Sequence, residues 1–253
     1  MEHLNYKKLK NKSNQKIELL PIQENTLLSE NKVTGLSINF PIGSTCKPSK
    51  VCIDTCYALT GPISWNASVV KQRKNELLCK NFPKGFAQKI VKEISKYMAK
   101  DNNFFLRWNG VGDLFKEAVD AIHELALKEP SMPIWVVTRI PEHAAKLADL
   151  LLPNVFIHFS LDEKSMDRKE KVEKLLTTAK NNLFYSYQCD KNETYNPISF
   201  ISVVFADKYN KDFISKVDET ICPLNTSENI EGMCNKCRRC FNGDAVNYKQ
   251  SSA

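Results

Sequence analysis

Long apolar runs are missing from this 253-residue sequence. No window approaches the roughly 18 consecutive apolar residues that a membrane-spanning helix needs. Residues 1–6 also lack the apolar core of a secretory signal peptide. We therefore expect a cytoplasmic protein without membrane contact. Because thiols stay reduced in that compartment, its cysteines are expected to bind metal and not to form disulfides.

A concentrated basic patch is missing as well. The formal charge of +7 comes from 36 basic and 29 acidic residues that are spread along the chain. Dispersed positive charge favours anionic partners only weakly, so nucleic acid is permitted as a partner but not indicated. The motifs G-x-x-x-x-G-K-[ST], G-x-S-x-G and H-E-x-x-H are absent. Phosphoryl transfer, serine acyl transfer and zinc-peptidase chemistry therefore have no support.

The sequence does have nine cysteines, and seven of them fall into two groups. The first group is Cys46, Cys52 and Cys56, directly after an alternating apolar run. Three thiolates in a loop after a strand leave a metal ion or cluster one protein ligand short, and an open position permits chemistry. The alternative is a structural zinc site completed by Cys79, Cys189 or a histidine.

The second group lies near the C-terminus and has the spacing C-x2-C-x2-C, preceded by a remote Cys-Pro pair. This spacing matches bacterial-type ferredoxins, in which such thiolates hold a cuboidal iron–sulfur cluster. Four thiolates also make a closed structural zinc site, so zinc remains the alternative. Four ligands close the coordination sphere, which predicts a structural or electron-transferring centre. The four residues are Cys222, Cys234, Cys237 and Cys240.

The middle of the chain alternates strand-like and helix-like segments, which predicts an α/β fold with a parallel sheet. Six strands suit an open sheet or a partial (β/α)6 barrel better than a closed eight-stranded barrel. In such folds the functional site lies at the carboxyl ends of the strands. Strands are predicted at residues 35–40, 104–108, 134–138, 155–160, 183–187 and 200–205, and helices at 64–80, 84–100, 114–128, 141–151, 165–179 and 211–217.

Three regions are predicted along the chain. Residues 1–33 are rich in polar side chains without a steady period, and we expect a poorly ordered or loosely packed arm. Residues 34–218 are predicted to form the partial (β/α)6 barrel-like parallel sheet. Residues 219–253 are predicted to form a C-terminal auxiliary cysteine-cluster segment and its tail.

Candidate cofactor-binding residues follow the predicted strands. Arg139 has a planar guanidinium that suits bidentate binding of a carboxylate or phosphate, and a solvated surface charge is the alternative. Asp113 and Asp162 have a second interpretation as N-cap residues of the helices that follow them. His158 lies within a strand and is interpreted as a hydrogen-bonded core histidine. The six candidates are Gly110, Gly112, Asp113, Arg139, Ser160 and Asp162.

Several motifs, taken in order, resemble those of the phage and bacterial gene product 88 family. They are a Cys-Tyr-Ala triplet that ends the first cysteine group, a Gly-Asp-Leu turn, an aromatic strand that ends in Thr-Arg, and the terminal cysteine group. The likeness covers residues 34–241. The motifs lie at Cys56–Ala58, Gly112–Leu114, Trp135–Arg139, and Cys222 with Cys234, Cys237 and Cys240.

More distantly, the layout is similar to that of the radical S-adenosylmethionine superfamily. That resemblance implies a 4Fe-4S cluster on the first three cysteines, whose open iron binds S-adenosylmethionine and cleaves it reductively to a 5′-deoxyadenosyl radical. The turn at residues 110–113 would correspond to the motif that binds the methionine amino group, and Ser160 and Asp162 would reach the ribose. The spacing differs, since this chain has C-x5-C-x3-C in place of C-x3-C-x2-C, and its aromatic residue, Tyr57, follows the third cysteine.

Two functions are predicted from these patterns. The first is an iron–sulfur enzyme of radical S-adenosylmethionine type, with one or two 4Fe-4S clusters, a small-molecule cofactor and an electron donor. The alternative is a non-catalytic zinc- or cluster-binding module that contacts nucleic acid or a host protein. Arg238 and Arg239 would add positive charge to such a module. No motif indicates the substrate.

Overall fold

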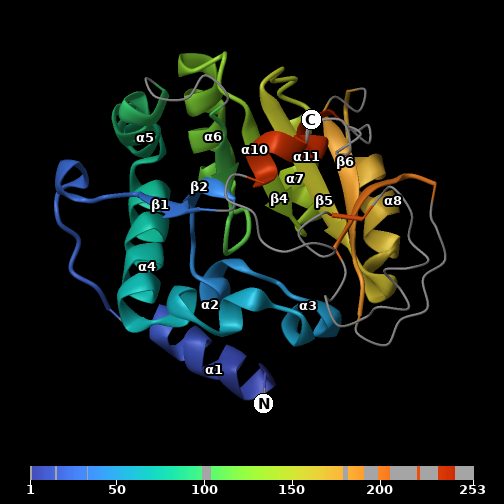
Figure 1. Ribbon diagram of the computed structural model, residues 1–253, viewed down its shortest axis with the longest axis horizontal. Helices are drawn as coiled ribbons and strands as arrows, with labels where there is room; N and C mark the ends of the chain where they lie inside the picture. The colour runs from blue at the N-terminus through green and yellow to red at the C-terminus, as the bar shows by residue number, and fades with distance from the viewer. Residues whose placement is uncertain are drawn as a thin grey trace.

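The computed structural model shows an α/β protein with one continuous sheet (Figure 1). It describes residues 2–14, 16–32, 34–98, 104–178, 182–190, 199–205, 221–222 and 233–242. The helix predicted at residues 211–217 lies outside these ranges. No helix in the described ranges is both long enough and apolar enough to cross a membrane.

Within the described residues, seven strands form the sheet, and their spatial order follows their order in the chain. The first strand pairs antiparallel with the second, and every later pair is parallel. The prediction of six parallel strands in an α/β fold is confirmed. The strands are β1 Leu28–Asn31, β2 Gly35–Ile38, β3 Leu106–Trp108, β4 Ile134–Thr138, β5 Val155–Leu161, β6 Leu183–Gln188 and β7 Ile201–Phe205.

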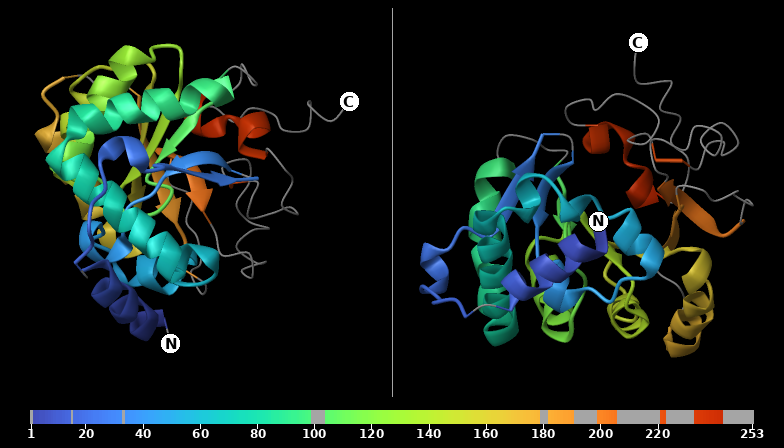
Figure 2. Two further views of the ribbon diagram at one scale, coloured as in Figure 1. Left: turned by 90° about the vertical axis from the view of Figure 1, so that its left-hand side faces the viewer. Right: turned by 90° about the horizontal axis from the view of Figure 1, so that it is seen from below.

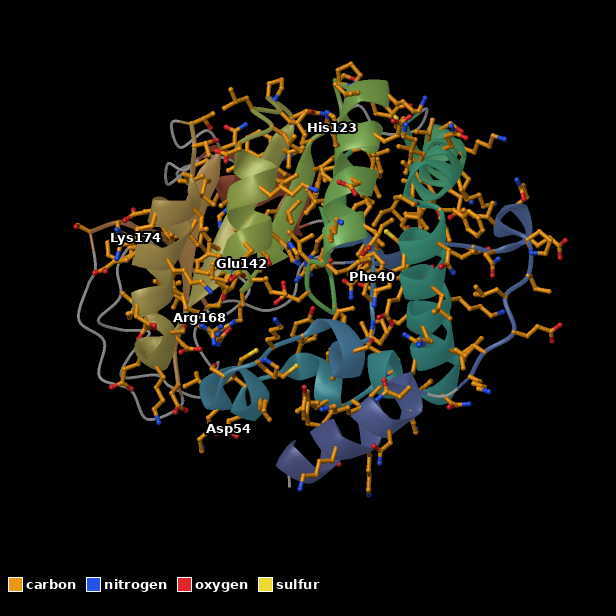
Figure 3. The ribbon with its side chains drawn as sticks, turned by 180° about the vertical axis from the view of Figure 1, so that it is seen from behind. Phe40, Asp54, His123, Glu142, Arg168 and Lys174 are labelled. Atoms are coloured by element: carbon orange, nitrogen blue, oxygen red, sulfur yellow. The ribbon has the colours of Figure 1, made fainter. Side chains whose placement is uncertain are left out.

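Five long helices cover one face of this sheet. Figure 3 shows the molecule from behind, with His123, Glu142 and Arg168 marking three of these helices in front of the strands. The main apolar core fills the space between the two layers. Phe86, Ile90 and Ile94 are fully buried there, as their helical spacing predicts. The helices are α4 Asn66–Asn81, α5 Pro83–Met98, α6 Lys116–Lys128, α7 Pro141–Ala148 and α8 Asp167–Leu175.

The opposite face of the sheet carries the C-terminal cysteine segment. Helices α10 (Met233–Cys237) and α11 (Arg239–Asn242) lie against this face, in front of the strands in Figure 1. Phe241 on α11 packs edge-on against Phe105 at 5.0 Å and Phe156 at 5.3 Å between ring centroids. Because side chains alternate along a strand, residues next to core positions supply this second face.

The N-terminal region contains regular structure, in contrast to the arm predicted for residues 1–33. Helix α1 (Glu2–Ser13) packs on the elements that carry the first three cysteines, a short turn of 3-10 helix, η1 (Ile22–Glu24), follows, and β1 extends the sheet. Leu9 and Leu28 are buried. The sheet thus begins before residue 34, where the barrel-like region was predicted to start. That predicted boundary falls inside the β1–β2 hairpin. The hydrophobic pattern of the sequence does not predict these two elements, because β1 has only four residues and α1 is mostly polar.

Candidate functional site

The first three cysteines are held by three short elements that follow β2. These are α2 (Ile42–Thr45), α3 (Lys50–Asp54) and the 3-10 turn η2 (Tyr57–Leu59). Cys46 directly follows α2, Cys52 lies within α3, and Cys56 precedes η2. The insertion of α3 explains the wide spacing of the group. We call residues 42–59 the cysteine loop. This loop lies at one end of the sheet, with α1 on its outer side (Figures 1 and 2).

The three cysteines line one open cavity of about 170 Å³. Residues from the carboxyl ends of β3, β4, β5 and β6 line the same cavity, as expected for a parallel sheet. Five of the six predicted cofactor-binding residues are among them, and Asp162 is not. The five are Gly110, Gly112, Asp113, Arg139 and Ser160.

Among the described residues, no further cysteine or histidine lines this cavity. Cys79 and Cys189 are fully buried in the main core. His158 is buried at a different place, where its Nε2 lies 2.9 Å from the carbonyl oxygen of Cys240, in agreement with the predicted hydrogen-bonded core histidine. Cys79, Cys189 and His158 are therefore not at the cavity, and Asp113 is the only acidic side chain among the described residues that line it.

Asp113 is buried, and its carboxylate is held by the end of β4. Its Oδ1 accepts hydrogen bonds from Thr138 Oγ1 at 2.6 Å and from the Leu114 amide at 2.8 Å. Burial raises its pKa to about 6, although these hydrogen bonds oppose the shift. The N-cap interpretation is wrong, because α6 begins at Lys116 and its N-cap is Phe115. The structure instead places Asp113 on the cavity wall.

The two glycines before Asp113 are required by close packing. A Cβ atom at Gly110 would lie 2.9 Å from Ser37 Cβ, and one at Gly112 would lie 2.7 Å from Phe40 Cβ. Gly112 also has a φ of +89°, which side chains rarely tolerate. Both residues let the turn after β3 approach the end of β2. This close approach of the turn to β2 fixes the position of Asp113, which directly follows Gly112.

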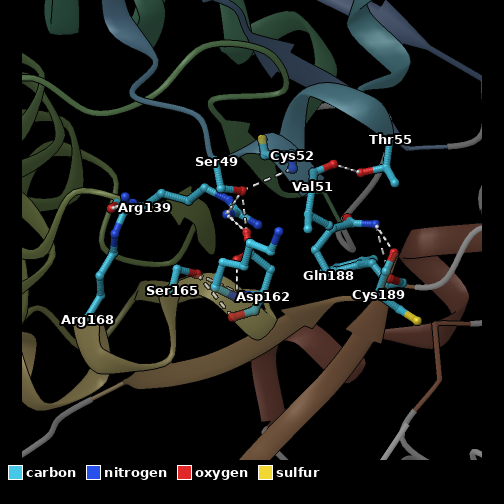
Figure 4. A network of polar contacts seen from close by, with 12 residues as sticks. Ser49, Val51, Cys52, Thr55, Arg139, Asp162, Ser165, Arg168, Gln188 and Cys189 are labelled. Carbon is cyan, nitrogen blue, oxygen red and sulfur yellow. Dashed lines mark hydrogen bonds and ion pairs between the residues drawn. The ribbon is translucent and has the colours of Figure 1, made fainter. Parts of the chain in front are cut away.

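Arg139 and Asp162 form a buried ion pair that reaches the cysteine loop (Figure 4). Arg139 Nη1 and Ser49 Oγ each lie 2.5 Å from Asp162 Oδ2. Ser49 Oγ in turn accepts a hydrogen bond from the Cys52 amide at 3.1 Å, which caps α3. Asp162 also caps the 3-10 turn η4 (Glu163–Ser165), whereas the N-cap of the following helix α8 is Met166, so its capping interpretation holds for the turn and not for the helix. This network connects the ends of β4 and β5 to Cys52.

The cysteine thiols of this loop are in an environment that disfavours the free thiolate. Burial raises the pKa of Cys46 well above its usual value, and nearby Asp113 raises it further. Burial also raises the pKa of Cys56 to about 11. Burial raises the pKa of Cys52, while the positive charge of Arg139 opposes the shift. Bound metal would compensate for burial, because it binds the thiolate and displaces the proton.

The arrangement of the thiols decides which kind of metal group fits. Among the described residues, no three Cys, His, Asp or Glu side chains are placed to hold a single metal ion. Zinc gathers its thiolates at about 2.3 Å from one point. A cuboidal cluster binds each thiolate at a different iron and so spreads them apart. The three thiols of the cysteine loop share a cavity but do not meet at one point.

The second cysteine group is assembled between the end of β7 and helices α10 and α11. The Cys222 amide donates a hydrogen bond to the Val204 carbonyl at 2.8 Å. Burial raises the pKa of Cys240 well above its usual value, and the three other cysteines of the group raise it further, so each of them is within electrostatic range of Cys240.

Arg238 and Arg239 are used within the protein. Arg239 Nη1 donates a hydrogen bond to the carbonyl of Ile221, an isolated β-bridge partner of Val204, at 2.6 Å, which attaches α11 to the residue before Cys222. The guanidinium carbon of Arg238 lies 5.5 Å from the ring centroid of Phe105 and 5.2 Å from that of Phe241. The two arginines that were considered for nucleic-acid contact therefore make contacts that hold the C-terminal segment on the sheet.

Some residues near the cavity were missed from the sequence. Tyr6 on α1 is close enough to Cys46, Cys52 and Cys56 for these thiols to raise its pKa, in addition to the larger effect of burial. Arg107 on β3 lines the cavity. A period-two pattern predicts that Arg107 and Phe105 share a face of the sheet, but nothing in the sequence locates Tyr6.

Comparison with known proteins identifies one relationship. The sequence matches the family model described as gene product 88 over residues 5–243. No curated protein and no solved structure matches the chain.

Proposed function

The chain belongs to the gene product 88 family, and from this premise we propose that it is an iron–sulfur protein of radical S-adenosylmethionine type. In this proposal an open 4Fe-4S cluster is held by the cysteine loop and a second, closed cluster by the C-terminal group. The proposal includes a soluble electron donor and a cytoplasmic location. The ligands are Cys46, Cys52 and Cys56 for the open cluster, and Cys222, Cys234, Cys237 and Cys240 for the closed one.

One observation supports the proposal most directly: three thiols line a cavity at the carboxyl ends of parallel strands, and the described part of its lining holds no fourth cysteine or histidine. A closed structural zinc site needs four protein ligands, so this geometry favours an open centre. The sequential order of six parallel strands is also the order of a (β/α) barrel, which supports a partial (β/α)6 barrel.

When bound, an open cluster supplies an iron that binds the amino and carboxylate groups of S-adenosylmethionine, and an electron for its reductive cleavage. Asp113 would accept a hydrogen bond from the N–H of that amino group, because hydrogen bonds to an ionised carboxylate are stronger than those between neutral groups. Thr138 and the Leu114 amide hold that carboxylate in place. Ser160 lines the cavity and would bind a hydroxyl group of the nucleoside.

Arg139 and Asp162 were predicted to bind the cofactor, and in this proposal they position the cysteine loop. Arg139 is paired with Asp162, so its guanidinium serves chiefly to hold Ser49 and the cysteine loop. Asp162 is fully buried and lies outside the cavity lining. We therefore assign both residues to positioning Cys52 and assign no cofactor contact to Asp162.

Cleavage of S-adenosylmethionine tests the proposal. The full chain, purified without oxygen and reduced with dithionite, is incubated with S-adenosylmethionine, and 5′-deoxyadenosine is measured by chromatography. We expect its formation by the wild-type chain and its loss in Cys52→Ala. Absence of the product from an iron-loaded wild-type chain would contradict the enzymatic part of the proposal.

The second candidate is a non-catalytic module with zinc or a cluster at the C-terminal site. It is favoured only by the closed, four-thiol composition of that group, which zinc also accepts. Its partner would be nucleic acid or a host protein. Two zinc ions and no iron in the anaerobic chain would support this candidate against the first.

A further inference from the structure

The second cysteine group packs on one face of the sheet, and the cavity of the first group lies at the end of the sheet that borders this face. Phe105 and Arg107 alternate with core positions of β3 and share this face, and Asn109 follows β3 with a left-handed φ of +60°. Phe105 contacts Phe241 next to the second group, whereas Asn109 lines the cavity of the first. Arg107 lies between these two positions and also lines the cavity. One cationic side chain is thus placed between the two groups.

The contacts of Arg107 fix its guanidinium without neutralising it. The strand register places Arg107 opposite Trp135, and the guanidinium carbon lies 4.8 Å from the centroid of the indole ring. Its Nη2 donates to Tyr57 Oη at 3.5 Å, and that hydroxyl also bonds to the Gly110 carbonyl. Among the described residues, no carboxylate forms an ion pair with Arg107, and its buried Nε has no hydrogen-bond partner.

The other arginine of the cavity differs in this respect. Arg139 is paired with Asp162, so its charge is already compensated. A half-buried guanidinium without an acidic partner costs desolvation energy, and such groups are normally matched by a negative charge. A negative ligand, a thiolate or a metal–thiolate centre would supply that match.

Both cysteine groups are within reach of Arg107. Tyr57, which Arg107 contacts, directly follows Cys56 in the cysteine loop. On the other side, Cys234 and Cys240 pack against the aromatic cluster that contains Trp135. No other side chain of the described residues has all of these contacts.

We propose that Arg107 is a shared counter-cation of the two thiolate centres. The identity of the metal in this proposal depends on the function proposed above, but the placement of the charge does not. A metal centre with several thiolate ligands is negatively charged, and it becomes more so when it gains an electron. A nearby cation therefore stabilises the reduced form and makes each centre easier to reduce. Loss of the cation should affect both centres together.

The test compares the reduction of both centres in the iron-loaded full chain. Each is titrated with dithionite and followed by electron paramagnetic resonance in wild type, Arg107→Lys, Arg107→Gln and Arg107→Met. We expect a several-fold lower ratio of reduced to oxidised cluster at both centres in the two neutral variants, and a ratio near wild type in Arg107→Lys. Arg107→Met keeps apolar packing on Trp135, so agreement between the neutral variants separates charge from packing.

Lys236 provides the matched control, because it is exposed and lies between two cysteines of the second group. Lys236→Gln removes the same charge, but solvent screens it, so the first centre should be unaffected. A shift at only one centre, or at neither, in Arg107→Gln and Arg107→Met would overturn the shared role.

A wild-type chain that takes up no iron would refute the proposed function but would still allow this test. Co(II) affinity would then be measured from the thiolate-to-metal absorption, in a Cys237→Ala chain for the first group and a Cys52→Ala chain for the second. We expect Arg107→Gln to weaken Co(II) binding at both groups. Unchanged affinity at either group would overturn the inference.

Discussion

At the scale of single residues, the surroundings of Asp113 indicate most directly what kind of ligand group it would bind. Its carboxylate is buried beside Cys46, with Oδ1 held by Thr138 and Leu114. Such a carboxylate costs free energy to bury, and a cationic ligand group would offset that cost. The sequence suggested an N-cap as the alternative, and only the start of α6 at Lys116 separates the two interpretations.

Asp113→Asn should retain cluster iron but bind S-adenosylmethionine at least about tenfold more weakly. A hydrogen bond to a charged group contributes about 1.5–3 kcal/mol, and 1.4 kcal/mol corresponds to about tenfold in affinity. Equilibrium dialysis measures the affinity, and Asp120→Asn on the exposed side of α6 is the control. Equal affinity in both variants would remove Asp113 from the binding site.

Metal affinity of the cysteine loop should rise with pH. The pKa of Cys56 is raised to about 11 and that of Cys46 is raised as well, so both thiols are protonated at neutral pH. Each thiol that binds metal must release its proton, and higher pH therefore favours the bound state by up to about tenfold per proton and pH unit. Co(II) titration of Cys237→Ala between roughly pH 6.5 and 8.5 checks this. A pH-independent affinity would show that the thiols are already ionised.

At the scale of secondary-structure elements, the cysteine loop depends on a network that no single element contains. Arg139 directly follows β4, Asp162 directly follows β5, and Ser49 caps α3. The sequence located the two strand ends and their convergence, because hydrophobic periodicity defines strands well. It could not pair Arg139 with Asp162, since that pairing depends on the register of β4 beside β5.

Asp162→Asn should destabilise the metal-free chain by about 3–5 kcal/mol, because it leaves the buried Arg139 charge without its partner. Urea denaturation measures the free energy of unfolding. Asp120→Asn breaks the exposed pair with Lys146 and should cost about 0–1 kcal/mol. If the two variants are equally stable, the network does not hold the loop in the way described.

At the scale of the whole molecule, the two faces of the sheet have different tasks. Helices α4 to α8 cover one face and form the core with it, whereas the other face carries the second cysteine group, and Arg107 lies between that group and the first group at the end of the sheet. The α/β class and the six parallel strands could be predicted, because each strand is an apolar run with turn residues at its ends. The N-terminal strand and helix could not, because β1 is short and α1 has few apolar residues.

The relationship between the two cysteine groups was also beyond prediction. They are far apart in sequence, and Arg107 belongs to neither spacing pattern. Their proximity follows from the packing of Phe241 on Phe105 and Phe156, and from the hydrogen bond between His158 and the Cys240 carbonyl. These contacts form only when the C-terminal segment folds back across the sheet.

The central claim, an open iron–sulfur cluster on the cysteine loop, is tested most directly by metal and sulfide analysis of the anaerobically purified full chain. Two 4Fe-4S clusters predict about eight iron and eight sulfide per chain, and Cys52→Ala should lose about half of each while the fold measured by circular dichroism is retained. Zinc in place of iron, or an unchanged iron content in Cys52→Ala, would contradict the claim.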